Sequence, residues 1–450
     1  MNSRLKKNIA IVLCLFVQTV EAQDLLETYQ QVLKSDPRLL IDSLGVEIGV
    51  AREKQSFGQL LPQASFSSSA NSSTRRAAGF PIDHYSGQRY VISVRQPLFD
   101  MQKYSAWQRS KSVQEQFKYQ YEDTRSTVRI DTVERYFALL KARSDLEIIK
   151  EEKGAVIGKK NLTSALYEKQ LVKVTELYEI VARLDILESE QVEATRLKEL
   201  AKADLSELTG EPIDELAELI SQPSTENELG KINDYVSSLS LENASLIALT
   251  QSIKAAQQNL KQQKAAHFPV VDLQLSKQQT NIGFENSISP ITDTEVISVN
   301  LSVPIFSGGA TTARIYEATQ QLEIAKAGYD QEHRRVKKEL EDEYLNVSST
   351  KRKVAALEKS VESAEKAYQA IEKSFEFGIA TISEVLDLQQ LRLRSKQKFQ
   401  QAKYDYVTSR ARFFHKAGLL TDNSLSEINK QLNKNGEQVS LFAHKEAHSK

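Results

Sequence analysis

The chain has 450 residues, a formal net charge of −1, 40% hydrophobic residues and a mean hydropathy of −0.43. Only 16 glycines and 9 prolines interrupt it, so we expect a large core built on long helices. The near balance of acidic and basic residues leaves no electrostatic footprint for nucleic acid, and this excludes a nucleic-acid-binding protein.

Residues 1–22 have the pattern of an export signal. Three basic residues precede an apolar run over 9–20, and small or tolerated residues follow, which predicts a secretory signal peptide. Its removal would leave 56 basic and 59 acidic residues, a net charge of −3. The single cysteine, Cys14, lies in this segment, so no disulfide and no cysteine metal site are expected in the rest of the chain. Beyond residue 22 no stretch of about 18 apolar residues occurs, so no transmembrane helix is expected.

The first half of the remaining chain predicts a helix, two strands and a long helical hairpin. The Pro-Leu-Phe corner at 97–99 leads from the second strand to Asp100, which can cap the following helix. Gly210 suits the end of the returning helix. The expected elements are a helix at 23–58, strands at 62–71 and 90–95, a loop at 73–88 between them, and a helix from 102 to about 160.

The second half repeats this plan after a connector with two prolines at 211–240. Its long helix has apolar residues at spacings of three and four, which predicts coiled-coil packing. The returning helix is expected to end at Gly418, and the charged residues from about 433 are expected to be disordered. The expected elements are a helix at 241–266, strands at 271–276 and 296–306, a loop at 281–293, and a helix at 310–375.

The two halves match residue by residue, which indicates an internal tandem duplication. The Pro-apolar-Phe corners at 97–99 and 304–306 lie 207 positions apart. Seven further pairs are separated by 208 positions: Tyr121 and Tyr329, Val128 and Val336, Tyr136 and Tyr344, Tyr167 and Phe375, Glu176 and Glu384, Glu179 and Asp387, and Gly210 and Gly418. This period is far longer than the 20 to 50 residues of ordinary solenoid repeats.

The four strand segments alternate between apolar and polar residues. Such alternation over about ten residues is typical of outer-membrane barrel strands, and a half-buried strand of a soluble sheet alternates in the same way. If the first interpretation holds, the lipid-facing side of segment 296–306 consists of Ile297, Val299, Leu301 and Val303. Four strands from one chain would leave unpaired edges in lipid, so several chains would have to close a barrel together.

Several motifs in a fixed order resemble the TolC family of outer-membrane efflux and secretion channels. They are LPQASF, VRQPLFD, ELTGEPI, FPVVDLQL, LSVPIFSGGATTA, SFEFGIATISEVLDLQQ and KAGLLT, and they extend over nearly the whole chain after residue 22. The resemblance implies an α+β membrane protein located in the cell outer membrane and extending into the periplasm. It also implies a homotrimer, in which four strands per chain form a 12-stranded β-barrel continuous with a helical coiled-coil barrel.

The same resemblance implies a domain organisation. After the signal peptide at 1–22 come a first structural repeat at 23–210, an equatorial connector at 211–240 and a second repeat at 241–418. Residues 419–450 would form a C-terminal equatorial segment and a disordered tail.

Two acidic pairs are candidates for a pore constriction. Glu384 and Asp387 lie three positions apart, so they share a helix face, and Glu176 and Glu179 occupy the matching places in the first repeat. The resemblance implies that the carboxylates of three chains ring the periplasmic constriction, where they would attract cations and raise one another's pKa. The alternative is a solvated carboxylate pair that the helix dipole favours in the first turn.

The chain departs from the family at the tip of the second hairpin. Phe375 and Ala380 stand where some members have a tyrosine and an arginine that help to latch the closed tip. The closed state of this chain would therefore be held in another way.

No catalytic or metal-binding motif is present, so the sequence predicts neither an enzyme nor a cofactor. The resemblance implies the outer-membrane exit duct of a tripartite efflux or type I secretion system. Its partners would be a periplasmic adaptor, docked at the hairpin tips, and an inner-membrane transporter of the ABC or proton-driven type. A periplasmic coiled-coil adaptor (membrane fusion) protein is the alternative, but it would have one hairpin between β modules. The sequence leaves open whether the cargo is a small toxic compound or a secreted polypeptide.

Overall fold

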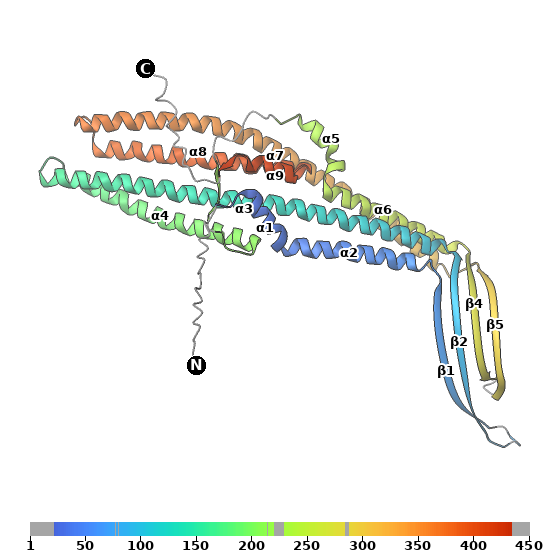
Figure 1. The fold of residues 1–450 in the computed structure, drawn as a ribbon. Coiled ribbons are helices and arrows are strands. Elements are labelled where there is room, and N and C mark those ends of the chain that lie inside the picture. Colours follow the sequence, from blue (N-terminus) through green and yellow to red (C-terminus); the bar gives the residue numbers. More distant parts are fainter. Residues whose placement is uncertain are drawn as a thin grey trace, which may run out of the picture.

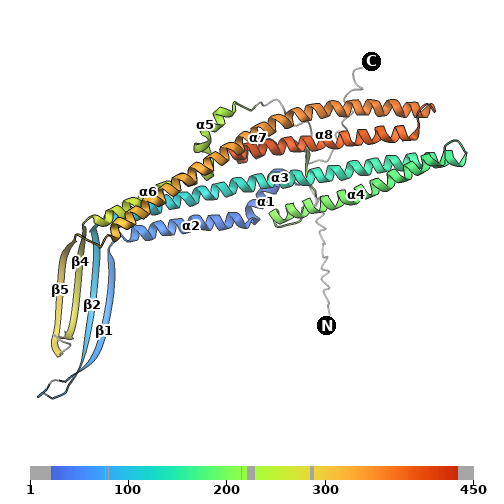
Figure 2. The same cartoon turned by 180° about the vertical axis from the view of Figure 1, so that it is seen from behind.

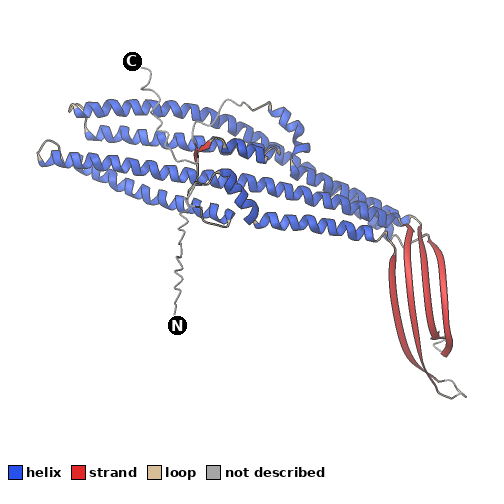
Figure 3. Cartoon of the chain, viewed as in Figure 1, coloured by secondary structure: helices blue, strands red, loops and turns tan. Residues whose placement is uncertain are grey.

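The computed structural model describes residues 22–76, 78–79, 81–213, 215–219, 229–283 and 288–433. Long helices lie side by side over most of the length of the molecule. The four long strands lie at one end, and the turns of the two helical hairpins lie at the other (Figures 1 and 2). The four long strands lie apart from the helices, and only the short strands β3 and β6 lie among the helices (Figure 3). No helix within the described ranges has the length and apolar content needed to span a membrane.

Each repeat contributes two helices, two strands and a long hairpin. In the first repeat these are α1 (Leu25–Ser35), α2 (Pro37–Gly58), β1 (Gln63–Arg75), β2 (Asp83–Phe99), α3 (Met101–Glu168) and α4 (Val174–Thr209). In the second they are α5 (Ile232–Glu242), α6 (Ala244–Lys264), β4 (Val270–Ile282), β5 (Ile288–Ser302), α7 (Ala310–Glu376) and α8 (Ile382–Ala417). The short elements are β3 (Glu218–Leu219), η1 (Ala265–His267), α9 (Asp422–Asn429) and β6 (Leu432–Asn433).

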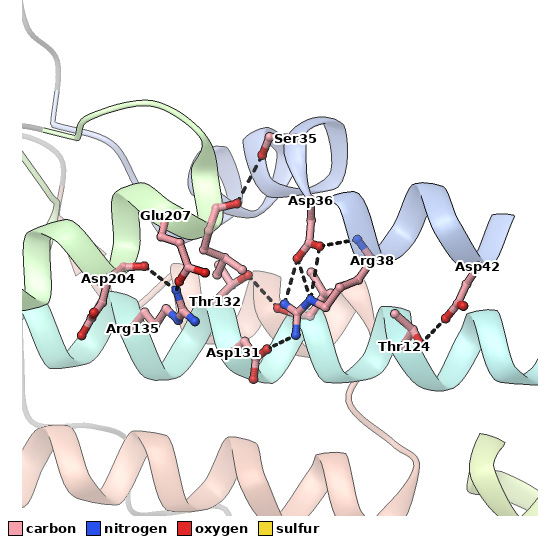
Figure 4. Close-up of polar contacts among 12 residues, drawn as sticks. Ser35, Asp36, Arg38, Asp42, Thr124, Asp131, Thr132, Arg135, Asp204 and Glu207 are labelled. Atoms are coloured by element: carbon pink, nitrogen blue, oxygen red, sulfur yellow. Dashed lines mark hydrogen bonds and ion pairs between the residues drawn. The ribbon is translucent and has the colours of Figure 1, made fainter. Parts of the chain in front are cut away.

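The single helix predicted over 23–58 is wrong, because the chain breaks at Asp36. The Asp36 carboxylate accepts a 2.8 Å hydrogen bond from the Arg38 backbone and caps α2, and Pro37 needs no hydrogen-bond partner at the first helical position. The Arg38 side chain binds Asp36 and reaches Asp131 of α3 at 2.7 Å (Figure 4). The second repeat breaks at Asn243, whose side chain accepts from the Leu246 backbone and caps α6.

The returning helices α4 and α8 each end at the predicted glycine, next to the helix break of the same repeat. Gly210 and Gly418 have φ of 73° and 77°, a left-handed conformation that suits glycine. A Cβ atom on Gly418 would lie 2.4 Å from the Glu242 carbonyl oxygen, and one on Gly210 would lie 3.2 Å from the Ser35 Cβ. The end of α4 is held by a hydrogen bond from Ser35 to a carbonyl oxygen of its last turn (Figure 4).

The four long strands form one antiparallel sheet in the order β1-β2-β4-β5. The pairing of β2 with β4 joins the two repeats. The strands extend further into the predicted loops than expected, because β1 extends to Arg75 and β2 begins at Asp83 inside the predicted loop 73–88. Likewise, β4 and β5 extend into the predicted loop 281–293. These extensions are mostly polar on both faces, so they lack the apolar alternation on which the prediction depended. The strand predicted over 296–306 is wrong at its end, because β5 stops at Ser302.

Three large apolar clusters, and a small one of Leu146, Ile149 and Ala194, hold the helices together. One surrounds the middle of the molecule, where Tyr136 and Phe137 of α3 are almost fully buried. A second lies between α7 and α8, and a third lies toward the hairpin turns. The seam predicted for α7 is confirmed, because its residues pack in the second and third clusters: Val354, Leu357, Val361, Tyr368, Ile371 and Phe375.

The predicted connector takes part in the middle cluster. Ile213 and Leu216 are buried there, and the Tyr136 hydroxyl donates to the Ala217 carbonyl at 2.9 Å. β3 of this segment pairs with β6 near the end of the described chain. The predicted signal peptide, apart from residue 22, and the predicted tail beyond 433 lie outside the described residues.

Candidate functional site at the hairpin turns and on the sheet

The two hairpin turns have the same backbone geometry. In the first, Leu171 donates its backbone N–H to the Leu166 carbonyl at 2.9 Å, and in the second, Ile379 donates to Ser374 at the same distance. Both turns lie at the end of the molecule remote from the strands (Figure 1). The helices that leave them, α4 and α8, carry the four candidate carboxylates in their first two turns.

Glu384 forms a capping box at the start of α8. Its carboxylate accepts hydrogen bonds from the Thr381 backbone N–H at 2.8 Å and from the Thr381 hydroxyl at 3.0 Å. In return, the Glu384 backbone donates to the Thr381 hydroxyl. The backbone N–H of Thr381 and then its hydroxyl lower the pKa of the Glu384 carboxyl. Within one chain this opposes the rise in pKa that crowding between chains is expected to cause.

The other three carboxylates are less constrained. Asp387, Glu176 and Glu179 make no hydrogen bond or ion pair with the side chains that the structure describes. α4 starts at Lys173 without a side-chain cap, and Lys169 lies in the same turn. Since the turn before α8 contains no lysine, the second pair has the more negative surroundings.

Apolar packing brings the starts of α4 and α8 together. Ile180 of α4 and Ile382 and Val385 of α8 are fully buried in one cluster. Phe375, at the position where some family members have tyrosine, packs against this cluster. The structure therefore brings together the helices that carry the two acidic pairs, while the carboxylates themselves make no contact with one another.

Polar contacts tie the two hairpins together near the turns. Lys159 of α3 forms an ion pair with Glu372 of α7 at 3.3 Å, and the Tyr368 hydroxyl donates to the same carboxylate at 2.7 Å. Burial raises the pKa of the Glu372 carboxyl, but Tyr368 and Lys159 outweigh burial and the net pKa is lowered. The Arg392 guanidinium lies 4.2 Å from the centre of the Tyr368 ring.

A buried polar pair, Glu152 of α3 and Gln389 of α8, was not predicted. Gln389 is fully buried and Glu152 is 3% exposed. Burial raises the pKa of Glu152, although Gln389 and then Arg183 lower it in part. The sequence did indicate that both residues are buried, because each lies on the apolar stripe of its helix, with apolar neighbours three or four residues away on either side.

A groove of about 610 Å³ opens between α3, α4 and α8. Its lining combines apolar residues such as Leu197 and Leu393 with the cations Arg183 and Arg394. The apolar periodicity of single helices could not indicate this groove, because the groove depends on the distance between α4 and α8.

The apolar residues of β5 lie together on one face of the sheet. Ile297 is 78% exposed, and Val299 and Leu301 are exposed to a similar degree, as is Val303 beyond the strand. In the register with β4, Leu301 stands opposite Val271 and Val299 opposite Leu273, so apolar residues of both strands share this face. Asn300 lies on the other face, where its side chain donates to Gln274 and Ser298.

Comparisons with known proteins agree with this geometry. The family model described as outer membrane efflux protein matches residues 235–418. The alkaline protease secretion protein AprF of Pseudomonas aeruginosa is 26% identical over 90% of this chain and 87% of its own length. The outer membrane protein TolC of Vibrio cholerae is 24% identical over 91% of this chain and 94% of its own length.

The fold also matches solved channel structures. The crystal structure of CusC superimposes with a TM-score of 0.78 at 15% sequence identity, covering 88% of this chain and 92% of CusC. The four antiparallel strands and the long helices of this chain therefore have the fold of this solved channel protein. The chain belongs to the TolC family of outer-membrane channels, which are non-enzymatic exit ducts of efflux and type I secretion systems.

Proposed function

We propose that this chain forms a trimeric duct that receives cargo from an inner-membrane transporter through a periplasmic adaptor docked at the hairpin turns. The observation that carries this proposal is the exposure of apolar side chains at both turns. Ile379 is 80% exposed, and Phe377 and Leu171 are similarly exposed. Apolar side chains gathered at one end of a molecule are typical of a protein-binding surface.

The position of these turns suits a link between two membranes. The 68 residues of α3 correspond to a helix about 100 Å long, more than three times the thickness of a hydrocarbon core. With the sheet in the outer membrane, the turns would lie deep in the periplasm. The nearby groove beside Arg183 and Arg394 offers a second contact for a helical partner.

We further propose that Glu384 and Asp387 narrow the pore at its periplasmic end. Three chains would bring three copies of each carboxylate around one axis, where the negative potential attracts cations. Glu176 and Glu179 are the weaker candidates, because Lys169 and Lys173 partly neutralise their turn. The ion pair of Lys159 with Glu372 would hold the hairpins together in place of the missing tyrosine and arginine.

We favour a secreted polypeptide as cargo. Two relatives, AprF and the proteases secretion protein PrtF of Dickeya chrysanthemi, are named for the secretion of proteases. A strain that has the transporter and adaptor of a protease secretion system but lacks its channel gives a direct test. Restored export by this chain supports the assignment, whereas restored resistance to small toxic compounds without protease export would contradict it.

Site-specific photo-crosslinking tests the docking surface. A photoreactive residue at position 379 should crosslink to the adaptor in cells that produce the complete system. The matched control is Ile291 of β5, which is 73% exposed at the opposite end of the molecule. Adaptor crosslinks from position 291 but not from 379 would show that the docking surface has been assigned to the wrong end.

A further inference from the structure

The register of the sheet directs two arginines of β2 to its polar face. Arg95 stands opposite Gln63 on one side and Gln274 on the other, and Arg89 stands opposite Ser69 and Thr280. Directly paired residues of antiparallel strands point to the same side, so these arginines share the face of Asn300 and Ser298. The apolar residues of β5 lie on the opposite face.

This polar face is the concave one. The buried residues of β2 and β4 include Tyr85, Asp272 and Ile282, which all lie on this face, whereas no described residue of these two strands is buried on the other face. Gln274 is an exposed exception on the polar face. Side chains on the inner face of a curved sheet lie close together and are less exposed, so this pattern indicates that the sheet curves toward its polar face. When three such sheets close a barrel, the concave face becomes the wall of the lumen.

The charge on this face is mainly positive. Asp272 compensates the charge of Arg95, but only one guanidinium nitrogen of Arg95 donates to it, and the Arg95 side chain is 63% exposed, so its other N–H groups can bind a further carboxylate. Arg89 is exposed and forms no ion pair with any residue that the structure describes. At the rim, Arg75 is matched in register by Asp83. Lys277, by contrast, lies on the convex face and is neutralised by Glu295 at 2.7 Å.

We propose that Arg89 and Arg95 of three chains form two rings of positive charge inside the barrel, which bind carboxylate-rich segments of a polypeptide in the exit. Arg95 lies six positions after Arg89, so the rings lie about 20 Å apart along the strands. An extended acidic segment of about six residues spans that distance. The inference rests on the proposed function, since it requires the concave face to line the exit.

Planar-bilayer recordings with poly-L-glutamate as the probe test this inference. The polymer is added on the side of the bilayer opposite the helices, and it should block the open wild-type channel reversibly. Arg89→Gln should raise the half-blocking concentration about tenfold, and Arg95→Gln should do the same. Arg95→Lys keeps the charge beside Asp272 and should preserve the block. The matched control is Lys277→Gln, which removes a positive charge from the convex face and should leave the block unchanged.

The outcomes separate this inference from the function on which it depends. A wild-type channel that conducts but is not blocked overturns the inference and leaves the proposed duct standing. The inference is also overturned if Lys277→Gln relieves the block as much as Arg89→Gln does. A purified trimer that forms no channel in bilayers overturns the proposed function and the inference together.

Discussion

Gln170 and Gly378 occupy the same place in the two hairpin turns, 208 residues apart, and both are left-handed. Their φ angles are 61° and 69°, and Gln170 is the sole non-glycine residue with positive φ in the described ranges. Each donates its backbone N–H to the residue three positions earlier, at 2.8 Å to Tyr167 and 2.9 Å to Phe375. The first turn therefore has a backbone geometry that its residue disfavours.

Gln170→Gly should stabilise the first turn by about 1 kcal/mol, because a non-glycine residue pays about 1–2 kcal/mol in this conformation. Glycine's greater freedom in the unfolded chain offsets part of the gain. Gly378→Ala should destabilise the second turn by a similar amount, since a Cβ there meets no atom within 4 Å and only the conformation is affected. Hydrogen exchange of the turn amides measures both changes, and slower exchange in Gly378→Ala would contradict the explanation.

The turns illustrate what a single sequence can predict. Gly378 marks the second turn in the sequence, and the repeat transfers that turn to Gln170, a residue that would not indicate one by itself. The helix ends at Gly210 and Gly418 and the cap at Asp100 were predicted and are confirmed. The break at Asp36 could have been predicted too, because Pro37 after a capping aspartate is a helix-start signal.

Gly418→Ala should destabilise the protein by about 3 kcal/mol, because it combines an unfavourable φ with a collision at the Glu242 carbonyl. The matched control is Gly328→Ala in α7, where a Cβ meets no atom within 4 Å. The higher helix propensity of alanine should raise the free energy of unfolding of this variant by about 0.5–1 kcal/mol. Thermal unfolding of the detergent-solubilised protein compares the two. Equal destabilisation by both changes would rule out the collision as the cause.

Glu152→Gln should stabilise the protein at neutral pH. Burial raises the folded-state pKa of Glu152, so this group's contribution is fully present below the unfolded pKa, near 4.3, and is lost as the pH rises through the folded pKa. The advantage of the variant should therefore grow from pH 4 to pH 7 in thermal unfolding. A gain that does not depend on pH would mean that the charge of Glu152 is not its cause.

Leu301→Arg should cost about 2–4 kcal/mol per chain and impair insertion, if Leu301 faces lipid near the bilayer midplane. Asn300→Arg, one residue earlier on the polar face, should insert normally and alter conductance. Recovery of each variant as trimer in the outer-membrane fraction measures insertion. Normal insertion of Leu301→Arg with failure of Asn300→Arg would mean that the two faces of the sheet are reversed.

The candidate site was less predictable than the fold. The four carboxylates could be found from their spacing and from the repeat, but the capping box of Glu384 depends on how its side chain folds back onto Thr381. The contact between Gly418 and Glu242 and the groove beside Arg183 depend on packing between elements far apart in sequence. The apolar periodicity of a helix indicates which face of that helix is buried, but it does not indicate which other element packs against that face.

The most direct test of the duct is a planar-bilayer recording of the purified wild-type trimer beside the double variant Glu384→Gln, Asp387→Asn. The wild type should insert, conduct and prefer cations, because the proposed constriction brings three copies of each carboxylate around one axis. The double variant should assemble equally well, because these side chains are exposed at the end of the molecule, and should lose most of that preference. A wild-type trimer that inserts without conducting would contradict the duct, and an unchanged cation preference in the double variant would show that the constriction lies elsewhere.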